Sequence, residues 1–376
     1  MLFLTSCKSA GESVYQEGLV LLENGKYEEA SEKMKKALEE NSDRADYYIG
    51  YGMCLIKVGN YDEALVQFDK SIVETNNSIT NRNKKKALRG KGIAYYQSGQ
   101  YEKAVTVFGD ALNIDELSTF NEDIRRYLAS CYLAMKDYER AIEVYDVLLK
   151  QKEDGAIFAG RGQVYMAMGE YQKAVEDFSQ AITKDSNQIS FYILKHDALI
   201  ALKKTEDAKE TLLAALSLKP ETMEEKFQMV TIRFYQEDYE TAIKELNEIV
   251  KDYPKGYFLL GEINFHLDQK EEAITAYQNY VKAGELMNAK KAYYKISECY
   301  LSNEEYEKAL AAVQEGLSIQ DNTYEKELSY NQVLCFEKLS RFEEAYQAAK
   351  EYVKKYPGQE DMEKELQFLE SRITVR

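Results

Sequence analysis

The stretch Gly99-Gln100-Tyr101-Glu102-Lys103-Ala104 recurs along the chain and decides the fold. Near copies begin at Gly25, Gly59 and Gly169. Weaker copies keep an aromatic residue three positions before an alanine, and two more keep the alanine alone. The alanines of this frame, here called the repeat alanines, are Ala30, Ala64, Ala104, Ala141, Ala174, Ala208, Ala242, Ala273, Ala309 and Ala345. Their spacings run from 31 to 40 residues and cluster near 34, which predicts a repeat architecture.

Other positions follow the same frame. A glycine lies twelve residues before the alanine in five copies: Gly18, Gly52, Gly92, Gly162 and Gly261. A large apolar residue lies four residues after it in six copies: Met34, Phe68, Phe108, Tyr145, Phe178 and Tyr277. The chain has only 3 prolines, and its apolar residues fall at three- and four-residue spacing. Each copy is therefore predicted to be two amphipathic helices joined by a tight turn, where glycine takes a positive φ angle.

This pattern resembles the tetratricopeptide repeat from about Gly11 to Gly358. The resemblance implies an all-α fold, a right-handed α-solenoid of about ten helical hairpins in which stacked neighbours supply the core. We expect hairpins near residues 11–44, 45–84, 85–121, 122–154, 155–188, 189–222, 223–253, 254–289, 290–325 and 326–358, with residues 1–10 as a separate N-terminal segment. The longest spacing predicts a polar loop over residues 76–83, and residues 359–376 are expected to hold a capping helix and tail.

The first residues contain Leu4-Thr5-Ser6-Cys7, which resembles the lipobox of bacterial lipoproteins. The resemblance implies lipidation at Cys7 and a location on the outer face of the cytoplasmic membrane. Fewer residues precede Cys7 than the roughly 7–15 apolar residues of a signal peptide. The alternative is a short tail that contains a cysteine, on a cytoplasmic protein. No run approaches the roughly 20 apolar residues of a transmembrane helix, so any membrane attachment is expected through Cys7.

Charge and residue usage argue against nucleic-acid binding and catalysis. The chain has 65 acidic and 49 basic residues, and its net charge of −16 disfavours nucleic acid and anionic lipid. Four cysteines share one position, ten residues before a repeat alanine, where a small apolar residue packs: Cys54, Cys131, Cys299 and Cys335. The only 2 histidines, His196 and His266, lie in different repeats. We therefore predict no catalytic residue, no metal and no cofactor, and a monomeric protein.

The resemblance implies that residues fifteen, eleven and eight positions before each repeat alanine face a concave groove. Arg89 and Arg126 share the first of these positions in adjacent repeats, with Ile93 and Tyr96 beside them. The two arginines are predicted to anchor a partner carboxylate. The alternative is that they pair with carboxylates of the groove or of the loops. The chaperone-binding clamp of some family members needs asparagines where this chain has Ile93 and Ser130.

A predicted aromatic strip occupies the same positions in later repeats: Phe227, Phe234, Phe258, Phe265 and Tyr294. Aromatic anchors in a groove suit an apolar or helical peptide. The alternative is that the rings are buried against the next repeat. The sequence as a whole predicts a protein-protein interaction scaffold, displayed as an envelope lipoprotein. A cytoplasmic regulatory peptide receptor and a docking subunit of an enzyme complex are the alternatives.

Overall fold

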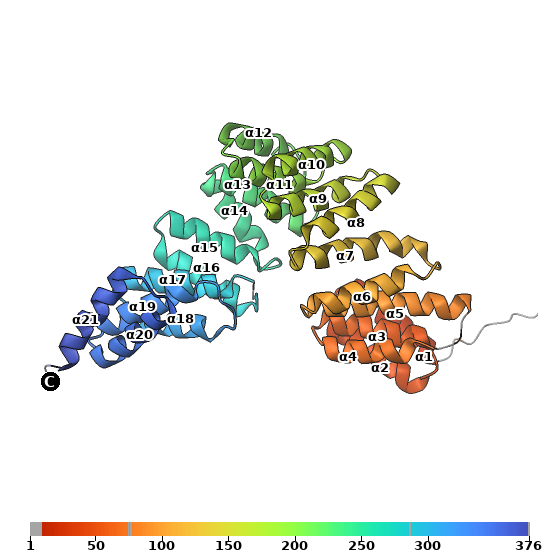
Figure 1. Cartoon of the computed structure of the whole chain (residues 1–376), viewed down its shortest axis with the longest axis horizontal. Helices are drawn as coiled ribbons and strands as arrows, with labels where there is room; N and C mark the ends of the chain where they lie inside the picture. Colours follow the sequence, from red (N-terminus) through yellow and green to blue (C-terminus); the bar gives the residue numbers. More distant parts are fainter. Residues whose placement is uncertain (1–9, 74, 76, 286, 375–376) are drawn as a thin grey trace, which may run out of the picture. The chain divides into compact units, whose positions relative to one another are not determined.

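The computed structural model describes residues 10–73, 75, 77–285 and 287–374, and this part of the chain is all α-helical, with no strand (Figure 1). Ten helical hairpins are followed by one further helix, as the sequence predicted. The helices of the hairpins are α1 (Ala10–Glu23) and α2 (Tyr27–Glu40), α3 (Ala45–Lys57) and α4 (Tyr61–Ser71), α5 (Ser78–Gln97) and α6 (Tyr101–Leu112), α7 (Asn121–Ala134) and α8 (Tyr138–Gln151), α9 (Gly155–Met168) and α10 (Tyr171–Lys184), α11 (Ile189–Ala201) and α12 (Thr205–Ala215), α13 (Met223–Tyr235) and α14 (Tyr239–Ile249), α15 (Gly256–His266) and α16 (Lys270–Lys282), α17 (Ala289–Ser302) and α18 (Tyr306–Ser318), and α19 (Glu325–Lys338) and α20 (Phe342–Lys355). A short 3-10 helix (Ser118–Phe120) precedes α7, and α21 (Glu360–Thr374) comes last.

The chain divides into two compact units, residues 1–208 and 209–376, and the division falls within α12. In the first unit, from α1 to α11, the two helices of a hairpin pack together, and the second helix also packs against the first helix of the next hairpin. The second unit repeats this arrangement from α13 to α20, and α21 packs on α20. Met362 and Leu369 of α21 are buried in the core, as expected of a capping helix.

The core is built from the repeated positions. All ten repeat alanines are fully buried. The glycine twelve residues before the alanine faces the large side chain four residues after it, so that the two helices of a hairpin approach closely. At Gly92, an added Cβ would lie 2.3 Å from the nearest ring carbon of Phe108. The same close approach joins Gly162 to Phe178, where the distance would be 2.6 Å.

The turn within each hairpin has a residue with positive φ, five positions before the repeat alanine. Glycine occupies four of these turns, including Gly99 with φ 75°. The other six turns have the same left-handed backbone without glycine, at φ values of 58–61°, and their residues are Lys136, Lys203, Glu237, Asp268, Glu304 and Ser340. The turn geometry is therefore kept where its usual residue is absent.

One local prediction was wrong. The expected polar loop over residues 76–83 is helical from Ser78, so that α5 is the longest helix among the described residues, with 20 residues. The side chain of Asn77 accepts hydrogen bonds from the backbone N–H groups of Ile79 and Thr80, and the Thr80 hydroxyl accepts one from the Asn77 N–H. This capping box starts the helix within a polar sequence.

Candidate peptide-binding cleft

A cleft of ≈ 350 Å³ opens in the second unit beside α13 and α15. Its floor and walls come from these two helices, from Tyr280 of α16 and from the segment that joins α16 to α17. The lining residues are Phe227, Thr231, Phe234, Tyr235, Lys255, Phe258, Leu259, Glu262, Tyr280, Glu285, Met287 and Asn288. Most of this surface is aromatic or aliphatic.

Helix periodicity explains why these side chains gather. On α13, Phe227, Thr231 and Phe234 are four and three residues apart and therefore share one helix face. The opposite face carries buried residues of the core, such as Met229 and Ile232. Each of the three phenylalanines that line the cleft, which include Phe258 of α15, is half-buried and packs at its base against a core cluster. The rings are thereby held in place while part of each faces the cleft.

The carboxylate of Glu262 on the cleft floor already has partners. Its Oε1 accepts a hydrogen bond of 2.6 Å from the Tyr277 hydroxyl, and its Oε2 lies 2.9 Å from Lys291 Nζ. Burial, and secondarily the charge of Glu262, raise the pKa of Tyr277, which keeps that hydroxyl protonated as the donor. Lys291 Nζ also lies 5.0 Å from the centroid of the Phe258 ring. The floor therefore has a fixed, charge-compensated carboxylate.

The other two residues of the predicted strip lie outside this cleft. Lys295 joins them, since its Nζ is 4.1 Å from the ring centroid of Phe265 and 5.2 Å from that of Tyr294. Tyr294 also stacks on Tyr324, with centroids 5.3 Å apart, and donates a hydrogen bond to Glu298. The strip therefore divides into a cleft and a separate cluster covered by a lysine. The role of these residues in binding stays a prediction.

The two predicted arginine anchors are engaged in ion pairs within the first unit. Arg89 pairs with Asp123 of the next hairpin, and its guanidinium lies 5.4 Å from the centroid of the Phe120 ring. Arg126 pairs with Glu122 at 2.8 Å on its own helix and approaches Asp154 of the next hairpin at 3.7 Å. These contacts match the alternative of pairing with the protein's own carboxylates. The side chains are nevertheless partly exposed, by 24% for Arg89 and 31% for Arg126.

Of their predicted neighbours, Ile93 is 3% exposed and belongs to the hydrophobic core, so the structure gives it a packing role. Tyr96 is partly buried between two other rings, with its centroid 5.8 Å from that of Tyr101 and 5.7 Å from that of Tyr127. Tyr96 therefore contributes to packing between hairpins as well as to the surface.

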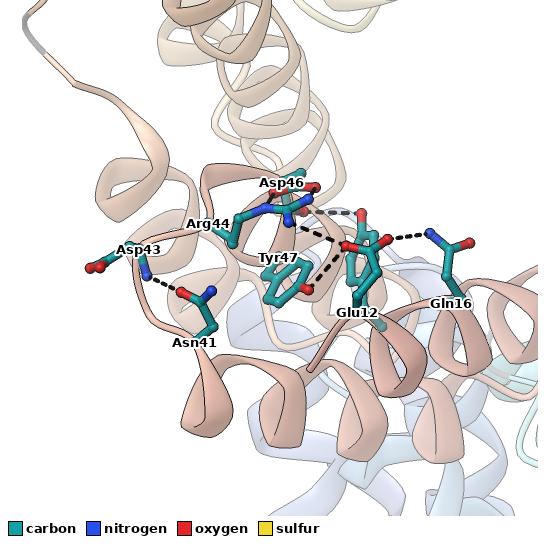
Figure 2. A network of polar contacts seen from close by, with 8 residues as sticks. Glu12, Gln16, Asn41, Asp43, Arg44, Asp46 and Tyr47 are labelled. Carbon is teal, nitrogen blue, oxygen red and sulfur yellow. Dashed lines mark hydrogen bonds and ion pairs between the residues drawn. The ribbon is translucent and has the colours of Figure 1, made fainter. Parts of the chain in front are cut away.

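A third arginine of this kind was missed in the sequence. Figure 2 shows Arg44, before α3, between Asp46 at 2.7 Å and Glu12 of the preceding hairpin at 3.2 Å. Its guanidinium lies over the ring of Tyr47, whose hydroxyl donates to Glu12. The Tyr47 ring stacks on Tyr15, with centroids 4.5 Å apart. Arginines in first helices, or just before one, thus tie neighbouring hairpins together. Their signal in the sequence is an acidic residue near the start of the next or preceding first helix.

The described residues hold no group of three or more His, Cys, Asp or Glu side chains that could bind a metal ion. The four cysteines at the shared position are buried, and burial raises the pKa of Cys54 and Cys299 to about 11 and that of Cys131 and Cys335 to about 12. These thiols are therefore protonated at neutral pH and suit packing rather than nucleophilic chemistry.

Among the described helices, none has the length and apolar character to cross a membrane. The predicted lipidation site, Cys7, lies outside the described residues.

Family models described as tetratricopeptide repeat match this chain over residues 43–116, 95–163, 156–188, 190–222, 227–288, 290–323 and 327–358. A model of the anaphase-promoting complex, cyclosome, subunit 3, matches residues 4–71.

Known proteins resemble the chain over parts of their length. A DnaJ homolog subfamily C member 7 homolog from Dictyostelium discoideum is 25% identical over 76% of this chain and 48% of its own length. The SGT1 homolog from Bos taurus is 32% identical over 27% of this chain and 28% of its own length. The chain thus spans about half or less of the length of these curated relatives. The crystal structure of a tetratricopeptide repeat protein from Parabacteroides merdae aligns with a TM-score of 0.47 and 16% identity, over 65% of this chain and 93% of that one.

Proposed function

The chain belongs to the tetratricopeptide repeat family, and we propose that it is a non-enzymatic scaffold that binds a peptide segment of another protein in the cleft of α13 and α15. The observation that carries this proposal is the convergence of Phe227, Phe234 and Phe258 on one hollow. Their rings are held by the core at the base and reach the cleft at the edge. Aromatic side chains that are already fixed in place bind a partner at little cost in conformational entropy.

The size of the cleft favours side chains of a peptide as the ligand. At ≈ 350 Å³ it lies at the lower end of the roughly 300–1,000 Å³ range of small-molecule pockets. Most of its lining is apolar, and Glu262 is occupied by Tyr277 and Lys291. Such a surface rewards burial of apolar area and offers no arrangement of groups for catalysis.

The names of some relatives mention chaperones, among them the Hsp70-Hsp90 organizing protein 3 from Arabidopsis thaliana, which is 22% identical over 68% of this chain. Chaperones are therefore one class of partner for the test below. The positions that hold clamp asparagines in some family members are Ile93, which is buried, and Ser130, whose hydroxyl donates to the Arg126 carbonyl. This arrangement favours the aromatic cleft over a carboxylate clamp.

Site-specific photocrosslinking tests the proposal. A photoreactive phenylalanine analogue is placed at Tyr235, which lines the cleft and is 39% exposed, or at Leu267, a matched position outside the cleft that is also 39% exposed. We expect a discrete crosslinked partner from the Tyr235 position in cells of the source organism and none from Leu267. Equal crosslinking from both positions, or none from Tyr235, would contradict the proposal.

We further propose that Cys7 carries a lipid that tethers the scaffold to the outer face of the cytoplasmic membrane. The support is the lipobox-like stretch that ends at Cys7. Expression with the native upstream sequence in a bacterium that processes lipoproteins, followed by mass measurement of the mature N-terminus, tests this. An acylated Cys7 supports the tether. An unmodified N-terminus overturns it and leaves the cytoplasmic receptor as the preferred alternative.

A further inference from the structure

We infer that the segment bound in the cleft of α13 and α15 carries a large apolar anchor residue and, beside it, a basic residue that pairs with Glu285. This inference rests on the proposed function and specifies the chemistry of the partner. It follows from the apolar lining of the cleft, from the state of the carboxylate on its floor and from the charges on its rim.

The interior of the cleft suits an uncharged anchor. The rings of Phe227, Phe234 and Phe258 line it, and Met287 at its rim is 91% exposed. A methionine this exposed beside a hollow of aromatic rings offers flexible apolar surface to a ligand. A leucine, methionine or aromatic side chain of the partner would bury this surface together with its own.

The floor of the cleft offers no free charge to a ligand. Both oxygens of Glu262 are engaged, one by the Tyr277 hydroxyl and the other by Lys291. A cationic side chain that entered the cleft would compete with Lys291, and an anionic one would meet the Glu262 carboxylate. Because a buried charge without a partner is costly, the anchor is expected to be neutral.

Two carboxylates line the cleft, and Glu262 is paired with Lys291 whereas Glu285 has no such partner within the described residues. Glu285 is partly buried and lies near the hydroxyls of Tyr253 and Tyr280, whose pKa values are raised mainly by burial and in part by its carboxylate. Within the described residues, Glu285 forms no ion pair or hydrogen bond. The Tyr253 hydroxyl donates to a further carboxylate, that of Glu224. Lys255, which also lines the cleft, is an exposed residue whose Nζ lies 5.9 Å from the centroid of the Tyr253 ring.

Charge complementarity therefore favours a basic group on the partner. The Glu285 carboxylate, which lines the cleft, is unpaired within the described residues, and the chain as a whole carries −16. A lysine or arginine next to the anchor would place a cation beside Glu285, the partly buried carboxylate that lacks one. The long-range field of the protein would also attract such a segment.

Selection from a phage-displayed library of random 12-residue peptides tests the inference on the full chain. Peptides are selected on the wild type and counted again on Tyr235→Ala and Phe258→Ala, each checked for an unchanged circular-dichroism spectrum. We expect the peptides lost on these variants to share an apolar anchor with a lysine or arginine within one helical turn. Enriched peptides that bind both variants as well as they bind the wild type would overturn the proposed function itself.

Charge reversal separates the inference from the proposed function. The Kd of a selected peptide is measured on Glu285→Lys and on Glu307→Lys, a matched reversal at an exposed glutamate of α18 outside the cleft. We expect Glu285→Lys to weaken binding about three- to tenfold more than Glu307→Lys, as an ion pair at a partly exposed site would. Replacing the basic residue of the peptide by glutamate should restore binding to Glu285→Lys. Equal effects of the two reversals, or cleft-dependent peptides without a basic residue, would overturn the inference and leave the proposed function standing.

Discussion

Replacing Gly92 by alanine tests the close packing of a glycine against a large side chain, which recurs in five of the hairpins. The new Cβ would lie 2.3 to 2.6 Å from three carbons of the Phe108 ring, and this ring is fully buried, so it cannot move into solvent. Forcing an extra carbon into a packed core costs about 1–3 kcal/mol. The better helix propensity of alanine returns about 0.5–1 kcal/mol. We expect a net loss of about 1–2 kcal/mol in the stability of α5 and α6.

Gly109, in α6 of the same hairpin, provides the matched control. A Cβ at this position meets nothing within 4 Å, so Gly109→Ala should stabilise the hairpin by about 0.5–1 kcal/mol. Native-state hydrogen exchange of the amides in α5 and α6 measures both effects locally, which matters because long repeat arrays need not unfold in two states. Adding Phe108→Leu to Gly92→Ala should recover part of the loss. Equal changes for Gly92→Ala and Gly109→Ala would refute the role of ring-on-glycine packing.

Three further predictions concern turns, ion pairs and pH. Lys136→Gly should raise the free energy of unfolding in urea by about 1 kcal/mol, because Lys136 has φ 60° in its turn, a left-handed backbone that strains a residue with a Cβ. An unchanged free energy of unfolding would show that the turn is unstrained. Arg161→Met should lower the free energy of unfolding by about 3 kcal/mol, because the Asp177 side chain, which is 6% exposed and accepts two hydrogen bonds of 2.8 and 2.9 Å from Arg161, would lose its cation. Adding Asp177→Asn should recover part of this loss. A double variant no more stable than Arg161→Met alone would contradict the explanation. Burial and the carboxyl group of Glu365 raise the pKa of Glu337 to about 8, so the folded state holds a proton that the unfolded state releases near pH 4.5. Stability should therefore fall as pH rises from about 4.5 to 8, and melting temperatures of Glu337→Gln should show a flatter slope across this range. An equal slope in both proteins would count against the raised pKa.

The fold was predictable from the sequence because its packing rule is repeated. A glycine and a ring sixteen residues apart, as at Gly92 and Phe108, fix how two helices meet, and the same pair recurs along the chain. Local features that occur only once in the chain were harder to predict. The start of α5 depends on the local capping box of Asn77 and Thr80, and the long alanine spacing suggested a loop there instead.

The candidate site was predictable only in part. Helix periodicity places Phe227 and Phe234 on one face of α13, and Phe258 of the next hairpin lines the same cleft. It could not show that Lys295 covers Phe265, since that contact depends on the separation between two hairpins. The contributions of Glu285 and Met287 come from a connecting segment outside the repeat frame, where spacing along the chain does not predict direction in space.

The ties between hairpins show the same limit. Arg89 and Arg126 stood out in the sequence as basic residues in a groove, but each lies within reach of a carboxylate on a neighbouring hairpin. Arg44, which forms the same kind of tie, lies before its helix and outside the positions expected to face the groove (Figure 2). An arginine side chain pairs with a carboxylate that lies within its reach, and a repeat pattern does not give the distances between side chains of different hairpins.

The affinity of the crosslinked partner for cleft variants tests the central claim most directly. The Kd is measured by calorimetry for the wild type, for Tyr235→Ala and Phe258→Ala, and for Leu267→Ala as the exposed control outside the cleft. Truncating an aromatic anchor at an interface costs about 1–3 kcal/mol, so we predict roughly 5- to 150-fold weaker binding for Phe258→Ala, a smaller loss for Tyr235→Ala and none for Leu267→Ala. Wild-type affinity in both cleft variants, with their folds intact, would contradict the account.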